Sequence, residues 1–182
     1  GPLRNVPQGK RLVLVTAHRR ETLGSPLRGI CRAVRKLAIA FAQDGVQFVC
    51  PVHPNPRVQR PFHQILSDCP GVTLTPPLDY PAVVHLMKQA CLILTDSGGL
   101  QEEAPTFGVP VLVLRKETER PEGLESGVSR LVGTEPESIV AAVETALGNP
   151  TEGKPPEGAG NPYGDGHAAE RITRILLESE PS

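Results

Sequence analysis

Residues 92–114 read LILTDSGGLQEEAPTFGVPVLVL, and the order of apolar and small residues within this stretch decides the fold. The stretch opens and closes on short apolar runs, which are typical of strands buried on both faces of a parallel sheet. Between the runs, Asp96-Ser97-Gly98-Gly99 predicts a turn, and a short acidic helix follows it. A strand, a turn, a helix and a second strand form the repeating unit of an α/β protein.

The predicted turn has the composition of an anion site. Ser97 can cap the helix, and Gly98 and Gly99 permit positive φ and remove the Cβ atoms that would keep a ligand off the backbone. Free amides at a helix start attract anions, and Glu102 or Glu103 could face the same ligand. A ligand whose phosphate binds the amides and whose hydroxyl groups bind a glutamate would be a nucleotide. The alternative is an ordinary joint between a strand and a capped helix.

The composition is that of an ordinary globular domain. The chain has 182 residues, of which 38% are hydrophobic and 21% are charged, so one well-buried domain is expected. A net charge of -1 argues against a general binder of nucleic acid or membrane surfaces, because that affinity comes mainly from excess Lys and Arg. The apolar runs are far shorter than the roughly 20 residues that span a bilayer, so the expected location is the cytoplasm.

Cysteine and methionine usage add two expectations. The four cysteines are scattered without a CxxC pair, which favours reduced core thiols over a metal site or a disulfide framework. No metal is therefore expected, and no cofactor is predicted either. The single methionine is Met87, so the sequence does not begin at a translation start and is expected to be a piece of a longer protein.

Strands and helices are expected to alternate along the whole chain. Strands are predicted over 11–17, 47–52, 72–75, 92–95, 109–114 and 128–132, and helices from Ser25-Pro26, over 57–68, over 80–90, after the glycine turn, over 134–147 and over 167–178. Ser25 and Asp79 are expected to cap the helices that they begin. Residues 1–10 are interpreted as a linker and 148–166 as a surface loop. The alternation predicts one domain over 1–182, a Rossmann-like, doubly wound parallel sheet.

Polar residues follow the first two predicted strands. His18 and Arg19 lie in the string HRRE after the first strand, and His53 follows the second strand beside two prolines. Open α/β sheets bind ligands at these strand ends, although both histidines could instead be satisfied by backbone groups. Arg28 and its basic neighbours on the first helix are interpreted as a solvent-facing surface. The dinucleotide fingerprint GxGxxG is absent after the first strand, which counts against an NAD enzyme, and a P-loop is also missing.

Four strings of residues carry a family resemblance. They are VTAHRRET at 15–22, PVHPNP at 51–56, LTDSGGLQEEAPTFGVPVLVLRKETERPEG at 94–123 and NPYGDG at 161–166. Taken jointly, they resemble the carboxyl-terminal domain of the non-hydrolysing UDP-N-acetylglucosamine 2-epimerases. The resemblance spans nearly the whole chain. It implies the second half of a two-domain enzyme with the glycosyltransferase-B arrangement, whose active site lies in the cleft between the domains.

The resemblance also implies a reaction. Enzymes of this family interconvert UDP-GlcNAc and UDP-ManNAc through anti elimination of UDP to a 2-acetamidoglucal and its re-addition, a step in the supply of sugars for cell envelope polysaccharides. The carboxylates that serve C2 lie on the first domain of the family and are absent here. This half is therefore expected to hold UDP, to be inactive alone, and to belong to a homodimer when the protein is full length.

Individual residues match the family's functional positions. In the turn, Ser97, Gly98 and Gly99 match the segment that holds the diphosphate, and Glu103 matches the glutamate that binds the ribose hydroxyls. Glu102 is expected to serve the helix dipole.

The histidines and arginines match the other side of the same site. His18 matches the family's functional histidine at the leaving diphosphate, and Arg19 is expected to supply fixed positive charge there. His53 matches a histidine tied to a second, activating UDP-GlcNAc site. Arg120, in the string ERPE, is a further candidate for a phosphate contact.

Three other functions fit parts of the same pattern. They are the donor-binding half of a glycosyltransferase, a hydrolysing relative that releases free ManNAc, and a non-catalytic module that binds a UDP-sugar. The strings HRRE and TERPEG favour the epimerase over the glycosyltransferase. The family often has ENFG where this chain has ETLG at 21–24, which leaves the details of that loop open.

Overall fold

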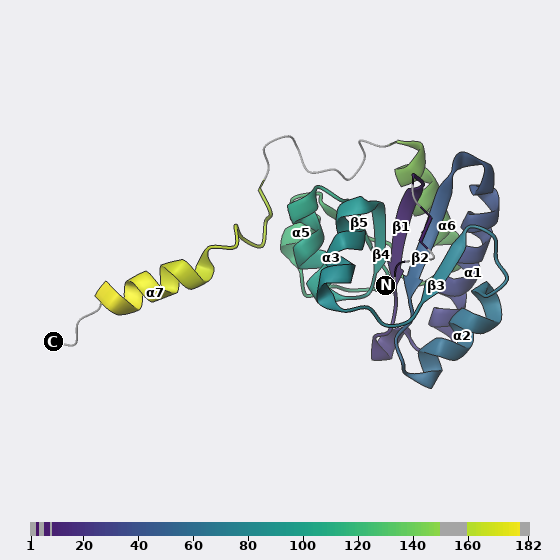
Figure 1. Ribbon diagram of the computed structural model, residues 1–182, viewed down its shortest axis with the longest axis horizontal. Helices are drawn as coiled ribbons and strands as arrows, with labels where there is room; N and C mark the ends of the chain where they lie inside the picture. The colour runs from purple at the N-terminus through teal and green to yellow at the C-terminus, as the bar shows by residue number, and fades with distance from the viewer. Residues whose placement is uncertain (1–2, 4–5, 8, 150–159, 179–182) are drawn as a thin grey trace.

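A parallel sheet forms the centre of the computed structural model, which describes residues 3, 6–7, 9–149 and 160–178 (Figure 1). Within the described residues the sheet has six strands in the order β3-β2-β1-β4-β5-β6, and every neighbouring pair is parallel. The strands are β1 (Arg11–Thr16), β2 (Val46–Pro51), β3 (Val72–Thr75), β4 (Ala90–Thr95), β5 (Val111–Val113) and β6 (Ser129–Leu131). The predicted Rossmann-like, doubly wound α/β fold is confirmed.

The order of the strands reverses at β1, and this reversal decides where a ligand can bind. Leu14 in β1 is level with Val49 of β2 on one side and with Ile93 of β4 on the other. The connections that leave β1 and β4 diverge to opposite faces of the sheet, so a crevice opens at the carboxyl ends of these two strands. Both strands are buried on both faces, as predicted: Leu14 and Leu94 are 0% exposed.

Helices cover both faces of the sheet. On one face, α1 (Ser25–Ala40) packs against α2 (Pro56–Leu66) and α6 (Pro136–Gly148), and the three lie together in Figure 1. The other face is covered by α3 (Tyr80–Gln89), α4 (Gly98–Glu103) and the 3-10 turn η3 (Ala104–Phe107). They contribute Leu86, Met87 and Ala104 to a second apolar cluster, and Leu100 of α4 packs against it. The remaining elements are η1 (Arg20–Thr22), η2 (Ala42–Asp44), α5 (Pro121–Glu125) and α7 (Ala168–Glu178).

The helix caps agree with the sequence at one position and differ at two. Asp79 caps α3, because its carboxylate accepts a hydrogen bond from the Ala82 N–H at 3.0 Å. The prediction that Ser25 caps α1 is wrong: Gly24 occupies the cap with φ 86°, a left-handed conformation that glycine adopts readily, so Ser25 is already helical. Ser97 does occupy the cap of α4, yet its side chain makes no capping hydrogen bond.

The carboxyl-terminal part of the chain divides into a docked segment and an exposed helix. Asn161 and Tyr163 are hydrogen-bonded to α4 and α5, respectively. In contrast, α7 projects away from the sheet (Figure 1). The amphipathic helix predicted over 167–178 is confirmed, and its apolar residues Ile172, Leu176 and Leu177 are 57%, 70% and 79% exposed. Most of the predicted loop over 148–166 lies outside the described residues. Among the described helices, none is long and apolar enough to cross a membrane.

Candidate functional site

A buried carboxylate ties together the two loops that flank the crevice. Asp96 follows β4 directly and is 0% exposed. Its Oδ2 accepts hydrogen bonds from the backbone N–H groups of His18 and Arg19 and from the Thr22 hydroxyl, each at 2.8 Å. A buried charge requires such donors, so the loop after β1 is folded around this side chain. Asp96 was part of the predicted turn but was not predicted to have this role.

The two histidines predicted at strand ends lie face to face. The rings of His18 and His53 are stacked, with centroids 5.2 Å apart and planes 9° from parallel. The Nδ1 atom of His53 accepts a hydrogen bond from the Asn55 N–H at 3.1 Å, which fixes the orientation of that ring. The loops after β1 and β2 therefore present one imidazole pair at the carboxyl edge of the sheet.

The surroundings of His18 favour its neutral form. Burial lowers the pKa of His18 from its ordinary value of 6.5 and is the largest effect. The Asp96 carboxylate raises this pKa in part, and the neighbouring His53 and Arg19 lower it further. Because the net direction is downward, His18 is neutral near pH 7 and has a nitrogen lone pair available to accept a proton.

The glycine turn lies beneath two guanidinium groups. A Cβ atom at Gly98 would lie 3.3 Å from Nη2 of Arg120 and 3.6 Å from Nη2 of Arg19. The turn itself is anchored by Thr95, whose hydroxyl accepts a hydrogen bond from the Ser97 N–H at 2.9 Å. Two positive charges from loops far apart in sequence therefore meet where the backbone has no side chain. This arrangement suits an anion with several oxygen atoms.

Glu102 holds Arg120 and does not have the role that the sequence predicted. Its Oε1 accepts a hydrogen bond from Nε of Arg120, forming an ion pair between α4 and the loop before α5. The prediction that Glu102 stabilises the helix dipole is wrong, because Glu102 lies in the last turn of α4 and not in its first turn. The pair leaves the Nη2 atom of Arg120 next to Gly98.

Glu103 turns back toward the glycine turn. Its Oε1 lies 3.7 Å from the position of a Cβ atom on Gly99, and its Oε2 accepts a hydrogen bond from the Tyr80 hydroxyl at 3.0 Å. That bond raises the pKa of Tyr80 above its ordinary value. A hollow of about 590 Å³ opens beside Tyr80 and Glu103. Tyr80 was missed by the sequence interpretation, since nothing in the order of residues pairs the start of one helix with the end of another.

The string NPYGDG acts as a strap across the same region. Nδ2 of Asn161 donates to the Glu102 carbonyl at 2.7 Å and to the Thr106 hydroxyl at 2.8 Å. The Tyr163 hydroxyl accepts from the Gly123 N–H at 2.9 Å and donates to the Arg120 carbonyl at 3.2 Å. The strap therefore fixes the loop that carries the Arg120 guanidinium.

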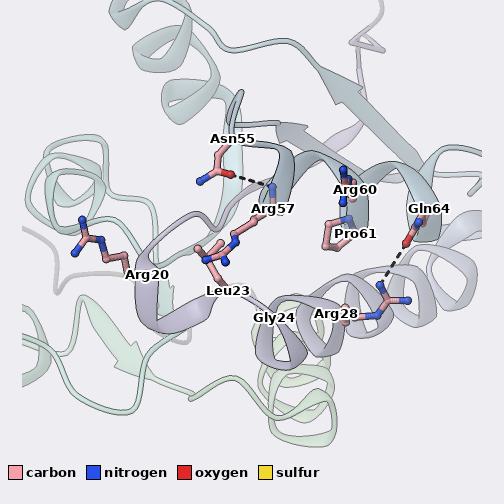
Figure 2. A pocket seen from close by; sticks show the side chains of 9 residues that line it. All are labelled: Arg20, Leu23, Gly24, Arg28, Asn55, Arg57, Arg60, Pro61 and Gln64. Atoms are coloured by element: carbon pink, nitrogen blue, oxygen red, sulfur yellow. Dashed lines mark hydrogen bonds between the residues drawn. The ribbon is translucent and has the colours of Figure 1, made fainter.

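A separate basic pocket of about 900 Å³ lies beside the candidate site (Figure 2). It is lined by Arg20, Leu23, Gly24, Arg28, Asn55, Arg57, Arg60, Pro61 and Gln64. Figure 2 shows the Arg57 side chain extending toward Leu23 and the Arg28 guanidinium bonded to Gln64, at 3.2 Å. The four arginines are exposed, which agrees with the prediction of a solvent-facing surface for Arg28. None of the predicted site residues lines this pocket, so it is distinct from the candidate site.

The structure brings the sequence-predicted residues to one edge of the sheet. Contacts link His18 with His53, join Arg19, Gly98 and Arg120, and join Ser97, Gly99 and Glu103. Within the described residues, no group of three or more His, Cys, Asp or Glu side chains gathers as a metal site.

Ligands of open α/β sheets bind outside the carboxyl ends of the strands, where the strand order reverses. At that position, the guanidinium groups of Arg19 and Arg120 lie close to Gly98, which has no side chain. The fold and the site together define a Rossmann-like protein with a positively charged edge at the crevice. The chain belongs to the UDP-N-acetylglucosamine 2-epimerase family, which matches residues 2–177.

Curated relatives and solved structures agree with this assignment. The chain is 48% identical over 167 residues to the UDP-N-acetylglucosamine 2-epimerase of Salmonella typhimurium, covering 92% of this chain and 44% of the relative. It resembles the UDP-GlcNAc 2-epimerase of Neisseria meningitidis bound to UDP-GlcNAc, with a TM-score of 0.88 and 38% identity, covering 96% of this chain and 46% of that one. It also resembles the S. aureus MnaA-UDP co-structure, with a TM-score of 0.83 and 39% identity, over 95% and 48% of the two chains.

The match is confined to one part of each relative. This chain spans about half the length of the curated relatives that it matches. The predicted family resemblance is therefore confirmed for this half of the protein.

The lowered pKa of His18 predicts a specific pH dependence of stability. At pH values between the ordinary pKa of 6.5 and the lower pKa of the folded state, His18 is protonated in the unfolded chain and neutral in the folded chain. The stability contributed by neutral His18 is therefore complete above pH 6.5 and is lost as the pH falls below it. Thermal melts of the chain should show a decline in Tm across this range that is shallower in His18→Gln.

The matched control is His85→Gln, because His85 is exposed and its substitution should leave the decline unchanged. Equal slopes for the wild type and His18→Gln would contradict the lowered pKa.

Proposed function

We propose that this chain is the UDP-holding half of a non-hydrolysing UDP-GlcNAc 2-epimerase. The whole protein would interconvert UDP-GlcNAc and UDP-ManNAc by eliminating UDP and adding it back to the other face of the sugar. The observation that carries the proposal is the meeting of Arg19 and Arg120 at Gly98, with the Glu103 carboxylate close to the neighbouring Gly99. A diphosphate between the guanidinium groups and ribose hydroxyls on the carboxylate would satisfy all of them.

Two similar structures support the choice of ligand. The Neisseria meningitidis enzyme was solved bound to UDP-GlcNAc, and the S. aureus MnaA protein was solved with UDP. Both proteins share this fold over nearly the whole of the present chain.

The proposed roles follow from the charges and contacts of the site. Arg19, Arg120 and the Ser97-Gly98-Gly99 turn would hold the diphosphate and stabilise the charge that grows on UDP as it leaves. His18 is neutral near pH 7 and would exchange a proton beside the leaving group. His53, stacked on His18, would contact the activating UDP-GlcNAc.

The rest of the site would come from a part of the protein that corresponds to the portion of the relatives not matched by this chain. The carboxylates that act at C2 of the sugar are proposed to lie there, in a first domain that completes a glycosyltransferase-B arrangement. The exposed apolar side chains Ile172, Leu176 and Leu177 of α7 would be covered in the whole protein. By family resemblance we also propose a cytoplasmic homodimer.

Removal of the Glu103 carboxylate should weaken UDP binding. In Glu103→Ala, the ribose hydroxyls lose a charged partner, so the binding free energy should fall by about 1 to 3 kcal/mol. Calorimetric titration of UDP into the 182-residue chain measures this change. Glu137→Ala, on α6, serves as the control and should bind UDP as the wild type does. Unchanged affinity in Glu103→Ala would refute the ribose role.

A side chain at Gly98 should abolish diphosphate binding. In Gly98→Val, the branched side chain would occupy the space beneath the Arg19 and Arg120 guanidinium groups, while the fold should survive because the nearest atoms are flexible side-chain ends. UDP titration together with a thermal melt separates the two effects. Gly148→Val is the control, since a Cβ atom there meets nothing within 4 Å. A folded Gly98→Val variant with normal UDP affinity would reduce the turn to a structural joint.

The reaction itself requires the longer protein. Supplied with UDP-GlcNAc, that protein should release UDP-ManNAc, and His18→Ala should lower its kcat by roughly 10²- to 10⁴-fold, the usual effect of a positioned acid-base group. The present chain should bind UDP weakly and produce no UDP-ManNAc. Free ManNAc as the product would instead identify a hydrolysing enzyme, and a transferred sugar would identify a glycosyltransferase. Turnover by the 182-residue chain would show that the groups acting at C2 do not lie in a separate first domain.

A further inference from the structure

The two oxygen atoms of the buried Asp96 carboxylate have very different surroundings. Oδ2 accepts three hydrogen bonds, from the backbone of His18 and Arg19 and from the Thr22 hydroxyl. Oδ1 is equally buried, yet it has no hydrogen-bond partner. An unsatisfied oxygen on a buried carboxylate is costly, so its retention calls for a partner close at hand.

The closest ionisable partner of Oδ1 is the imidazole of His18, whose Nδ1 lies 3.8 Å away. The same carboxylate holds the backbone N–H of His18 through Oδ2, at 2.8 Å. The imidazole is therefore fixed from two directions. Oδ2 of Asp96 accepts a hydrogen bond from the His18 backbone, and Oδ1 faces Nδ1 of the His18 ring. The stacked ring of His53 limits rotation on the other side.

A carboxylate in this position selects the tautomer of a neutral imidazole. Such a ring has one N–H and one lone pair, on different nitrogens. A lone pair on Nδ1 would face the negative Oδ1 and be repelled, whereas an N–H at Nδ1 would be attracted. The neighbouring ring has the opposite arrangement, because Nδ1 of His53 accepts from the Asn55 N–H and its own proton must therefore lie on Nε2 when it is neutral.

We propose that Asp96 is a positioning residue that holds the proton of His18 on Nδ1 and leaves the Nε2 lone pair free. Nε2 is then the nitrogen at which the ring accepts a proton, and the imidazolium so formed lies against the Asp96 carboxylate, which stabilises it. The assignment of the tautomer stands on the structure of this chain alone. Only its catalytic use rests on the proposed function of His18.

The tautomer can be measured in the 182-residue chain without any ligand. Long-range ¹H–¹⁵N correlation spectra distinguish a protonated from an unprotonated ring nitrogen, and the spectrum of His18→Gln identifies the His18 signals among those of the five histidines. At a pH where the ring is neutral, His18 in the wild type should be predominantly the Nδ1–H form. His53 should be predominantly the Nε2–H form.

The decisive variant is Asp96→Asn. The amide oxygen must still accept the two backbone N–H groups, so the amide N–H₂ would face Nδ1 of His18 and donate to it. His18 should then change from predominantly Nδ1–H to predominantly Nε2–H. Asp79→Asn is the matched control: it makes the same chemical change in another aspartate that accepts a backbone N–H at a helix start, and it should leave His18 as it is.

Either of two results would overturn the inference. One is a wild-type His18 in the Nε2–H form, a measurement that does not depend on any variant folding. The other is a folded Asp96→Asn variant that retains the Nδ1–H form. A separate UDP titration keeps the two proposals apart: wild-type chain that shows the Nδ1–H form but fails to bind UDP would contradict the proposed function and leave the role of Asp96 intact.

Discussion

The carboxylate of Asp96 is the interaction on which the candidate site depends. It follows the central strand β4 and accepts three hydrogen bonds from the loop after β1, a segment 74 to 78 residues away in sequence. Because a buried charge is tolerated only where donors surround it, the loop has little freedom to fold otherwise. The His18 imidazole and the Arg19 guanidinium take their places as a consequence.

A second set of contacts positions the opposite wall of the site. Glu102 holds the Arg120 side chain, Asn161 holds the Glu102 backbone, and Tyr163 holds the Arg120 backbone. The strap formed by NPYGDG thus positions Arg120, which lies 43 residues before Tyr163. Positive charge is concentrated at Gly98 in a chain whose formal net charge is only -1. Local arrangement, and not overall composition, makes this edge suited to an anion.

The division of labour within the proposed enzyme follows from the same geometry. The groups at the crevice that suit the nucleoside diphosphate of the proposed function are two guanidinium groups, a glycine turn, a carboxylate and a neutral imidazole. The match to relatives over about half their length agrees with a division in which this half holds the leaving group and the other half acts on the sugar.

The sequence by itself determined the architecture and the family. Apolar periodicity predicts the strands and most of the helices, and the residues before α3 predict the Asp79 cap. The motifs around His18, Ser97 and Glu103 identify the family. Each of these signals is local or lies in a fixed string of residues. Tertiary structure alone decided the partners. The pairing of Tyr80 with Glu103 and of Glu102 with Arg120, and the clamp formed by Asp96, join residues 23, 18 and up to 78 positions apart. Whether a carboxylate serves a helix dipole, an arginine or a backbone loop depends on which donor the fold brings within 3 Å, and the order of residues along the chain does not contain that distance.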